Sequence, residues 1–211
     1  MLNLYLLSLS EAEKLPEALC ERYFPERMKR ARRFLKKEDY LRCVAAGALT
    51  AFVLGAEERE IARNEWGKPF LPGKNVFFSL SHSGDYALLA ADDAEVGADL
   101  EKNAGFLPKV AERVFTPEEL EWMNGSPEIR FYQLWTMKES VMKLDGRGFS
   151  LAPNSFSVLP LLKGDPLLSG AGELCGHTEI FRDCTLSVCA LHPIGKPVPW
   201  EMTAEELLKL R

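Results

Sequence analysis

The chain has 211 residues, of which 46% are hydrophobic and 27% are charged. This is the composition of an ordinary globular protein, with enough apolar material for a core in one domain or in two packed halves. The formal net charge of −5 argues against nucleic-acid binding as the main task. No stretch approaches the roughly 20 apolar residues that a membrane span requires, so we expect no membrane association.

The five cysteines are odd in number and scattered, and they form no C-x-x-C motif. This usage favours reduced thiols in a cytoplasmic protein over a disulfide framework or a zinc site. Residues 1–9 are apolar but lack a basic segment. They predict a first strand rather than a signal peptide.

A basic segment follows, with nine Lys/Arg against four Asp/Glu between Glu21 and Arg42. Pro25 suits the first turn of a helix, so Arg27, Arg30 and Arg42 can fall on related faces of a helical hairpin. A solvated helix face is the simplest interpretation. Arginine outnumbers lysine six to three, however, and its planar guanidinium suits phosphate. We therefore expect at least one phosphate contact here.

Residues 39–55 carry apolar side chains at helical spacing and predict a core helix. Residues 64–73 form a loop by composition, in which Gly67 permits a tight turn and Pro69 fixes the chain after Lys68. A rigid loop of this kind can press its backbone or a proline face against a flat base.

A strand over 76–80 is expected to lead through a small polar turn into a second strand over 86–91. His82 lies in this turn between Ser81 and Ser83. Such neighbours make a poor apolar niche for a structural histidine, so contact with a polar ligand is favoured.

The next strand ends in Gly97-Ala98-Asp99-Leu100-Glu101. Alternation places Asp99 and Glu101 on one face, roughly 6.5 Å apart, with Gly97 leaving room beside them. Two acids at one point repel each other unless a cation or a shared proton lies between them. The alternative is a solvated edge strand.

The helix predicted over 128–145 places Trp135, Glu139, Met142 and Lys143 on one stripe. Glu139 and Lys143 could form a simple surface pair. A stripe shared with tryptophan and methionine favours an inward position, which is costly for charges unless a specific partner meets them.

The second half echoes the first. Pro117 and the helix ending before Gly146 repeat Pro25 and the helix ending before Gly55 at a similar offset, and a late strand pair around Leu159 and over 185–190 repeats the hairpin. We predict an α+β fold of two similar α/β subdomains, residues 1–101 and 102–211, related by a pseudo-twofold with the active site at their interface. Residues 151–180 are the least regular and predict loop, or a surface that adapts to a partner.

Four motifs in this order resemble the Sfp-type 4′-phosphopantetheinyl transferases: Gly67-Lys68-Pro69, Ser79-Leu80-Ser81-His82-Ser83, Gly97-Ala98-Asp99-Leu100-Glu101 and residues 135–143, W-x-x-K-E-x-x-x-K. The match spans residues 24 to 150, and the last two motifs together are quite specific. Ser79 departs from the family, in which many members have asparagine.

The resemblance implies transfer of the phosphopantetheine arm of coenzyme A to a serine of an apo acyl or peptidyl carrier protein, releasing adenosine 3′,5′-bisphosphate. It implies Mg²⁺, with Mn²⁺ as a possible substitute, held by Asp99, Glu101 and Glu139, since an all-oxygen site suits a hard cation. Glu139 would also take the serine proton, and Lys143 would neutralise the leaving phosphate, with Asp99 completing the catalytic group.

The residues implied for coenzyme A are Arg27, Arg30, Arg42, Lys68, Pro69, Ser81, His82, Lys138 and Lys143. The segment after Gly146 is expected to bind the carrier protein. Arg147 in this segment suits the acidic recognition helix of such carriers. We expect a monomer with no nucleic-acid partner.

Two other classes use similar residues. A Mg²⁺-dependent phosphohydrolase or nuclease also combines clustered carboxylates with arginines, but it would release its product to water. A non-catalytic module that binds carrier proteins or nucleotides would lack turnover.

Overall fold

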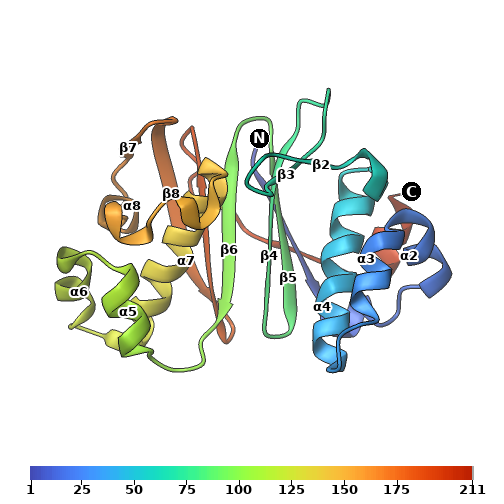
Figure 1. Cartoon of the computed structure of the whole chain (residues 1–211), viewed down its shortest axis with the longest axis horizontal. Helices are drawn as coiled ribbons and strands as arrows, with labels where there is room; N and C mark the ends of the chain where they lie inside the picture. Colours follow the sequence, from blue (N-terminus) through green and yellow to red (C-terminus); the bar gives the residue numbers. More distant parts are fainter. Residues whose placement is uncertain (211) are drawn as a thin grey trace.

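The computed structural model describes residues 1–210. Two four-stranded sheets lie next to each other in the middle of the molecule, and helices cover the outer side of each (Figure 1). The secondary structure is therefore mixed, as the α+β prediction required. None of the helices over residues 1–210 combines the length and the apolar character needed to cross a membrane.

The first sheet has the strand order β10-β1-β5-β4. Its strands are β1 (Asn3–Ser8), β4 (Phe77–Ser83), β5 (Tyr86–Asp92) and β10 (Trp200–Met202). The helices on this side are α1 (Leu9–Ala12), α2 (Glu17–Tyr23), α3 (Pro25–Ala31), α4 (Lys37–Ala48) and α9 (Ala204–Lys209). The helical turns η1 (Leu49–Val53) and η2 (Glu58–Glu60) follow α4, and the short strands β2 (Ala62–Arg63) and β3 (Pro69–Phe70) pair with each other.

The second sheet has the order β6-β9-β8-β7. Its strands are β6 (Val96–Lys102), β7 (Leu167–Ser169), β8 (Gly172–Phe181) and β9 (Cys184–Ala190). The helical elements on this side are α5 (Pro108–Val114), α6 (Pro117–Met123), α7 (Pro127–Asp145), η3 (Gly148–Ser150), η4 (Pro153–Ser155) and α8 (Leu159–Lys163).

The two sheets share a pattern of antiparallel neighbours. β5 lies between β1 and β4, and β9 lies between β6 and β8. The strand of residues 97–101 belongs to the second sheet, and the last strand of the chain returns to the first, so the C-terminus lies beside the helices of the N-terminal half (Figure 1). Sheet membership thus divides the chain near residue 95 and again before β10. The boundary after residue 101 and the pseudo-twofold remain predictions.

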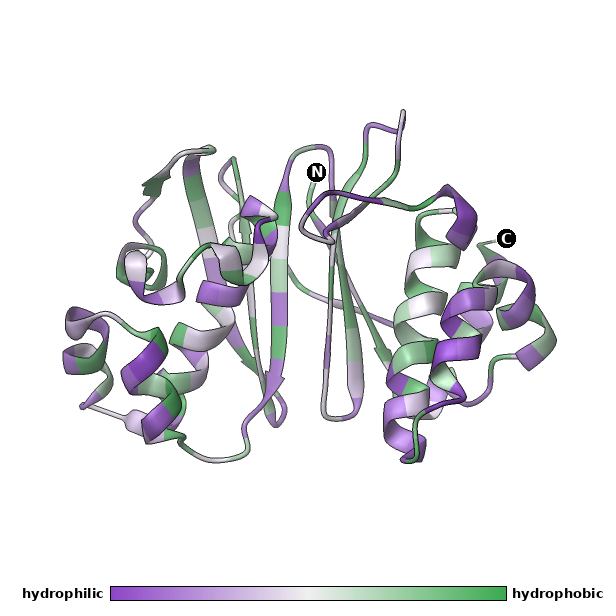
Figure 2. Ribbon diagram, in the orientation of Figure 1, coloured by the Kyte–Doolittle hydropathy of each residue, from purple (hydrophilic) through white to green (hydrophobic). Residues whose placement is uncertain are grey.

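Three apolar clusters hold these layers together. One joins α4 to the first sheet, one joins α7 to the second sheet, and the third lies between the sheets and includes Leu88, Ala98, Leu100 and Val188. Hydrophobic residues (green) follow the strands, whereas hydrophilic ones (purple) gather on α3 and at the lower end of α4 (Figure 2). The faces of β6 therefore separate as alternation predicts, with Ala98 and Leu100 in the core.

Several predicted elements are confirmed, with shifted ends. The first strand, the hairpin of β4 and β5, and helix α7 lie where the sequence places them. The helix predicted over 39–55 is present, but its last turn, η1, is a π-helix. All five cysteines are free.

Two expectations about residues 151–180 are wrong. Leu159 begins helix α8 rather than a strand, and the partner of β9 is β8, within the segment expected to be loop. The amino-acid composition of β8 explains the wrong prediction. β8 carries glycine, histidine, threonine and glutamate in place of a regular apolar alternation, and its pairing with β9 fixes the strand.

Candidate active site

Helix α7 crosses β6 in contact with its backbone. A Cβ atom added to Gly97 would lie 1.8 Å from the backbone oxygen of Ser140 and 2.6 Å from the backbone nitrogen of Leu144. Only glycine permits this approach. The room left by Gly97 is therefore filled by α7, and this close approach places the side chains of α7 next to the acids of β6.

Asp99 is almost completely buried, at 3% exposure, and has two partners on one oxygen. Its Oδ1 accepts hydrogen bonds from Ser81 Oγ at 2.7 Å and from Lys143 Nζ at 2.6 Å. Its Oδ2 is buried and has no hydrogen-bond partner among the described residues. A buried carboxylate oxygen without a partner is costly, so this atom is suited to a ligand that supplies positive charge.

Glu101 lies two residues further along the same face of β6. Ser83 Oγ donates to its Oε2 at 2.7 Å. Burial, and then the charge of Asp99, raise the pKa of the Glu101 carboxyl, while hydrogen bonds from Ser83 and Trp135 lower it. Glu101 is thus held between β4 and α7.

Glu139 faces these acids from α7. Burial raises its pKa to about 7, Asp99 and Glu101 add to this effect, and Lys143 opposes it. The side chain is half-buried rather than directed into bulk solvent. Lys143 pairs with Asp99 instead of forming the i,i+4 surface pair with Glu139. Three carboxylates and one ammonium from β6 and α7 therefore share one electrostatic environment.

The chemistry of these donors fits a divalent cation. The set offers only carboxylate oxygens, which suits Mg²⁺, and the unpartnered Oδ2 of Asp99 provides a place for it. The oxygens of Asp99, Glu101 and Glu139 do not all lie within 4.8 Å of one another. Mg²⁺ keeps several of its waters in protein sites, which allows such a spacing.

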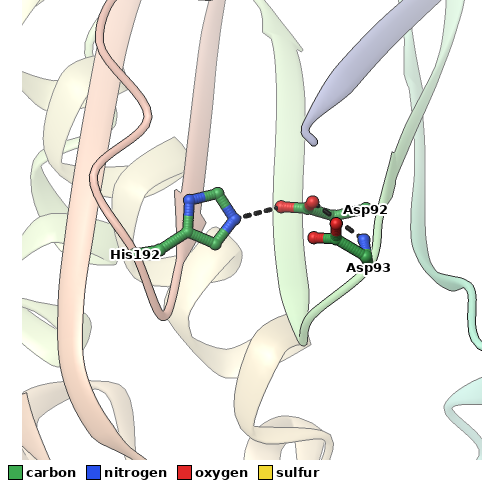
Figure 3. A group of neighbouring side chains, drawn as sticks. All are labelled: Asp92, Asp93 and His192. Atoms are coloured by element: carbon green, nitrogen blue, oxygen red, sulfur yellow. Dashed lines mark hydrogen bonds and ion pairs between the residues drawn. The ribbon is translucent and has the colours of Figure 1, made fainter.

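A second group, Asp92, Asp93 and His192, does have its ligand atoms within 4.8 Å of one another. Figure 3 shows the His192 ring directed at Asp92, with Nε2 and Oδ2 2.6 Å apart. The α-amino nitrogen of Met1 lies 3.1 Å from Asp92 and 2.8 Å from Asp93. These carboxylates already have cationic partners, so the group is an ion-pair cluster at the end of β5.

The basic segment reaches the same seam from α3 and α4. Arg42 donates to the backbone oxygen of Gly84 and to Asp39 Oδ1, both at 2.6 Å. Desolvation by surrounding atoms, followed by the charges of Lys143, Arg42 and Arg27, lowers the pKa of His82, although part of its side chain is exposed. The structure therefore brings Lys143, Arg42 and Arg27 near His82. Arg30 contacts the Cys43 sulfur at 3.8 Å and is otherwise exposed.

The loop before β3 caps helix α7. Lys68 Nζ donates to the backbone oxygen of Leu144 at 2.8 Å and also pairs with Glu95. Asn64 Nδ2 donates to the backbone oxygen of Gly146 at 3.1 Å. A lysine at the C-terminal end of a helix donates to carbonyls of the last turn and interacts favourably with the helix macrodipole. Pro69 lines a separate pocket of about 80 Å³ that also includes Arg27.

Lys138 is not brought to the acids. Its side chain is 1% exposed and pairs with Glu119 at 2.8 Å. The ammonium also donates to the backbone oxygens of Pro153 and Phe156, at 2.7 and 2.6 Å. Burial lowers its pKa, and Glu119 opposes this effect. Lys138 therefore ties α7 to the following segment. The coenzyme A contact that the resemblance implied for Lys138 stays a prediction.

Sequence reasoning missed two residues that touch the acids. Ser83 was noted only as a neighbour of His82, and Trp135 only as a member of an apolar stripe. Strand alternation was a usable signal for Ser83, because Ser79, Ser81 and Ser83 share one side of β4. No local signal predicted that β4 would meet β6 across the two sheets.

A family model described as the 4′-phosphopantetheinyl transferase superfamily matches residues 95–189. This range contains β6, α7 and β9, and with them the three carboxylates and Lys143. The acid cluster at the junction of β6 and α7 is thus part of the region that the family model describes.

Similarity to known proteins extends over most of the chain. A Bacillus subtilis 4′-phosphopantetheinyl transferase is 34% identical over 206 residues, covering 89% of this chain and 88% of the relative. The 4′-phosphopantetheinyl transferase Sfp of Bacillus subtilis strain 168 is 33% identical over 199 residues, covering 87% of this chain and 89% of the relative. A human L-aminoadipate-semialdehyde dehydrogenase-phosphopantetheinyl transferase is 33% identical over 187 residues, covering 75% of this chain and 58% of the relative. The chain belongs to the Sfp-type 4′-phosphopantetheinyl transferases.

Proposed function

We propose that the chain transfers 4′-phosphopantetheine from coenzyme A to a serine of an apo acyl or peptidyl carrier protein, with Mg²⁺ and at the junction of two pseudo-twofold-related halves. Family membership supports the reaction class. The observation that carries the site is the buried, unpartnered Oδ2 of Asp99, next to Glu101 and Glu139. A helix-covered sheet in each half, with the acids where the sheets meet, supports the interface location.

The reaction breaks one phosphoanhydride bond and forms one phosphodiester. The serine oxygen attacks the phosphorus that carries pantetheine, and adenosine 3′,5′-bisphosphate leaves with the bridging oxygen. A divalent cation on Asp99, Glu101 and Glu139 would supply positive charge to the diphosphate. Glu139 is placed to accept the serine proton directly or through a water, and such general-base help typically contributes about 10²–10⁴ in rate.

The cations around the seam suit the rest of coenzyme A. Lys143 is placed to stabilise charge on the leaving phosphate, where electrostatic positioning is the main contribution. Arg27, Arg42 and His82 form a basic group for the 3′-phosphate. Arg30 is exposed on the same segment and can join them, while Pro69 borders the pocket beside Arg27.

The test uses a panel of apo carrier proteins incubated with coenzyme A and Mg²⁺. Intact-mass spectra should show one phosphopantetheine added per carrier, with no addition when the acceptor serine is replaced by alanine. A parallel reaction without carrier measures hydrolysis of coenzyme A. Product formation that does not need carrier would indicate a phosphohydrolase, and no turnover with any carrier would indicate a binding module.

A further inference from the structure

Strands β4 and β6 belong to different sheets but lie next to each other along the seam between them. Three serines of β4, two residues apart, face β6. Their hydroxyls make five hydrogen bonds to β6. Ser79 Oγ donates to the backbone oxygen of Ala98 and accepts from its backbone nitrogen. Ser81 Oγ donates to Asp99, and Ser83 Oγ donates to Glu101 and accepts from the backbone nitrogen of Lys102. Serine hydroxyls thus join the two sheets at this seam.

The serines differ in what they hold. Ser79 binds only backbone, since its hydroxyl accepts from the nitrogen of Ala98 at 3.0 Å and donates to the oxygen of the same residue at 3.3 Å. It fixes the position of β6 but touches neither acid. Ser79 therefore serves as an internal control for the other two.

Ser83 is oriented from both sides. Its oxygen accepts the backbone N–H of Lys102 at 3.0 Å, and its own proton is donated to Glu101 Oε2 at 2.7 Å. The accepted N–H occupies one lone pair and leaves the hydroxyl proton directed at the carboxylate. Ser81 Oγ donates to Asp99 Oδ1 at 2.7 Å, and Oδ2 of Asp99 has no hydrogen-bond partner within residues 1–210.

We propose that Ser83, assisted by Ser81, is a positioning residue that acts from the neighbouring sheet and orients the carboxylates of β6 for the divalent cation. This inference rests on the proposed function, because it assigns a cation to Asp99 and Glu101. Groups that orient metal ligands are typically worth 10- to 100-fold in metal affinity or activity. Ser81 would thereby act on a metal ligand through its hydrogen bond to Asp99.

The experiment measures Mn²⁺ binding directly by electron paramagnetic resonance, without coenzyme A or carrier. Ser83→Ala should weaken Mn²⁺ binding about 10- to 100-fold. Ser83→Thr retains the hydroxyl and should stay within about threefold of the parent. Ser79→Ala removes a seam contact of the same chemistry and should leave Mn²⁺ affinity within about twofold. Urea unfolding of each variant without metal reports the loss of stability separately.

Transfer kinetics add a second readout. In Ser83→Ala, the Mg²⁺ concentration for half-maximal transfer should rise by the same factor as the Mn²⁺ dissociation constant, while kcat at saturating Mg²⁺ falls less. Equal Mn²⁺ affinity in parent and Ser83→Ala would overturn the inference and leave the proposed function intact. Equal losses in Ser83→Ala and Ser79→Ala would assign the effect to the seam as a whole and also overturn it. A parent that binds no Mn²⁺ would overturn the inference, and one that also transfers no phosphopantetheine to any carrier would overturn the proposed function as well.

Discussion

Lys143 Nζ lies 2.6 Å from Oδ1 of Asp99, so an ammonium on α7 holds one oxygen of a buried carboxylate on β6. The other oxygen of Asp99 has no hydrogen-bond partner in the described part of the chain. The pair joins two elements that are far apart in sequence, and it leaves Asp99 partly neutralised before any ligand binds. In the proposed function, Lys143 would act on both the carboxylate and an incoming phosphate.

Replacement of this lysine should reduce catalysis more than binding. We expect Lys143→Met to lower kcat about 10²- to 10³-fold at saturating coenzyme A and Mg²⁺, the effect typical of removing one preorganised donor. Intact-mass time courses on an apo carrier would measure it. Lys102→Met removes a nearby ammonium that pairs with Asp183 at the surface, and it should retain nearly full kcat. Similar rates in the two variants would contradict a role for Lys143.

Gly97 should tolerate no side chain. Gly97→Ala would place a carbon 1.8 Å from the backbone oxygen of Ser140, which forces α7 and β6 apart. Overpacking of this kind costs about 3 kcal/mol, and the shift should also weaken divalent-cation binding. Gly170→Ala is the control, because a Cβ there meets nothing within 4 Å. Urea unfolding measures both, and a Gly97→Ala protein as stable as the parent would contradict the close approach.

The stability of the metal-free protein should fall as pH rises from about 4.5 to about 7. The folded-state pKa of Glu139 is raised to about 7 from 4.5, so the native state keeps a proton that the unfolded state releases. The contribution of this proton to the free energy of unfolding is complete below the unfolded-state pKa and is lost by pH 7. It amounts to at most about 3 kcal/mol. Glu101 has a raised pKa as well and adds in the same direction.

Urea unfolding in the presence of EDTA at several pH values measures this dependence. Glu139→Gln should flatten the decline, because its side chain has no proton to lose. Saturating Mg²⁺ should also flatten it by stabilising the ionised form. His82 and His177 have lowered pKa values and act in the opposite direction, so the comparison between parent and Glu139→Gln is decisive. Equal pH dependence in the two proteins would remove Glu139 from this effect.

Arg42 should contribute to recognition of the 3′-phosphate. It already holds Gly84 and Asp39 by charge-assisted hydrogen bonds in the group that contains His82. We expect Arg42→Ala to reduce the preference for coenzyme A over 3′-dephospho-coenzyme A about tenfold or more, since such bonds contribute roughly 1.5–3 kcal/mol. Arg59→Ala is the control, because Arg59 is 81% exposed and pairs with Glu57 at the surface. An unchanged kcat/KM ratio in Arg42→Ala would remove Arg42 from this role.

The buried pair of Lys138 and Glu119 should matter for stability. Lys138→Met leaves Glu119 uncompensated in the core, and breaking such a pair typically costs about 3–5 kcal/mol. The double variant Lys138→Met/Glu119→Leu removes both charges and should recover most of that loss. Thermal unfolding compares the three proteins. A raised KM for coenzyme A in a stable double variant would support the coenzyme A contact that the resemblance implied.

Much of this protein follows from local sequence. Alternation places Asp99 and Glu101 on one face of β6 and Ala98 and Leu100 in the core, because the period of a strand is two wherever one face is buried. Apolar spacing likewise predicts α7. Spacing along one element is set by the backbone itself, so these features require no knowledge of other segments.

Other features depended on how distant segments meet. Lys138 and Glu139 are adjacent in sequence, yet the first is buried with Glu119 and the second faces Asp99 and Glu101, because successive helical residues point about 100° apart and different neighbours cover each side. The partners of Ser83 and the pairing of β8 with β9 were likewise decided by packing. The sequence by itself determined which side chains each element presents. Only the tertiary structure decided which of them meet, since the apolar layers between helices and sheets set the distances between elements.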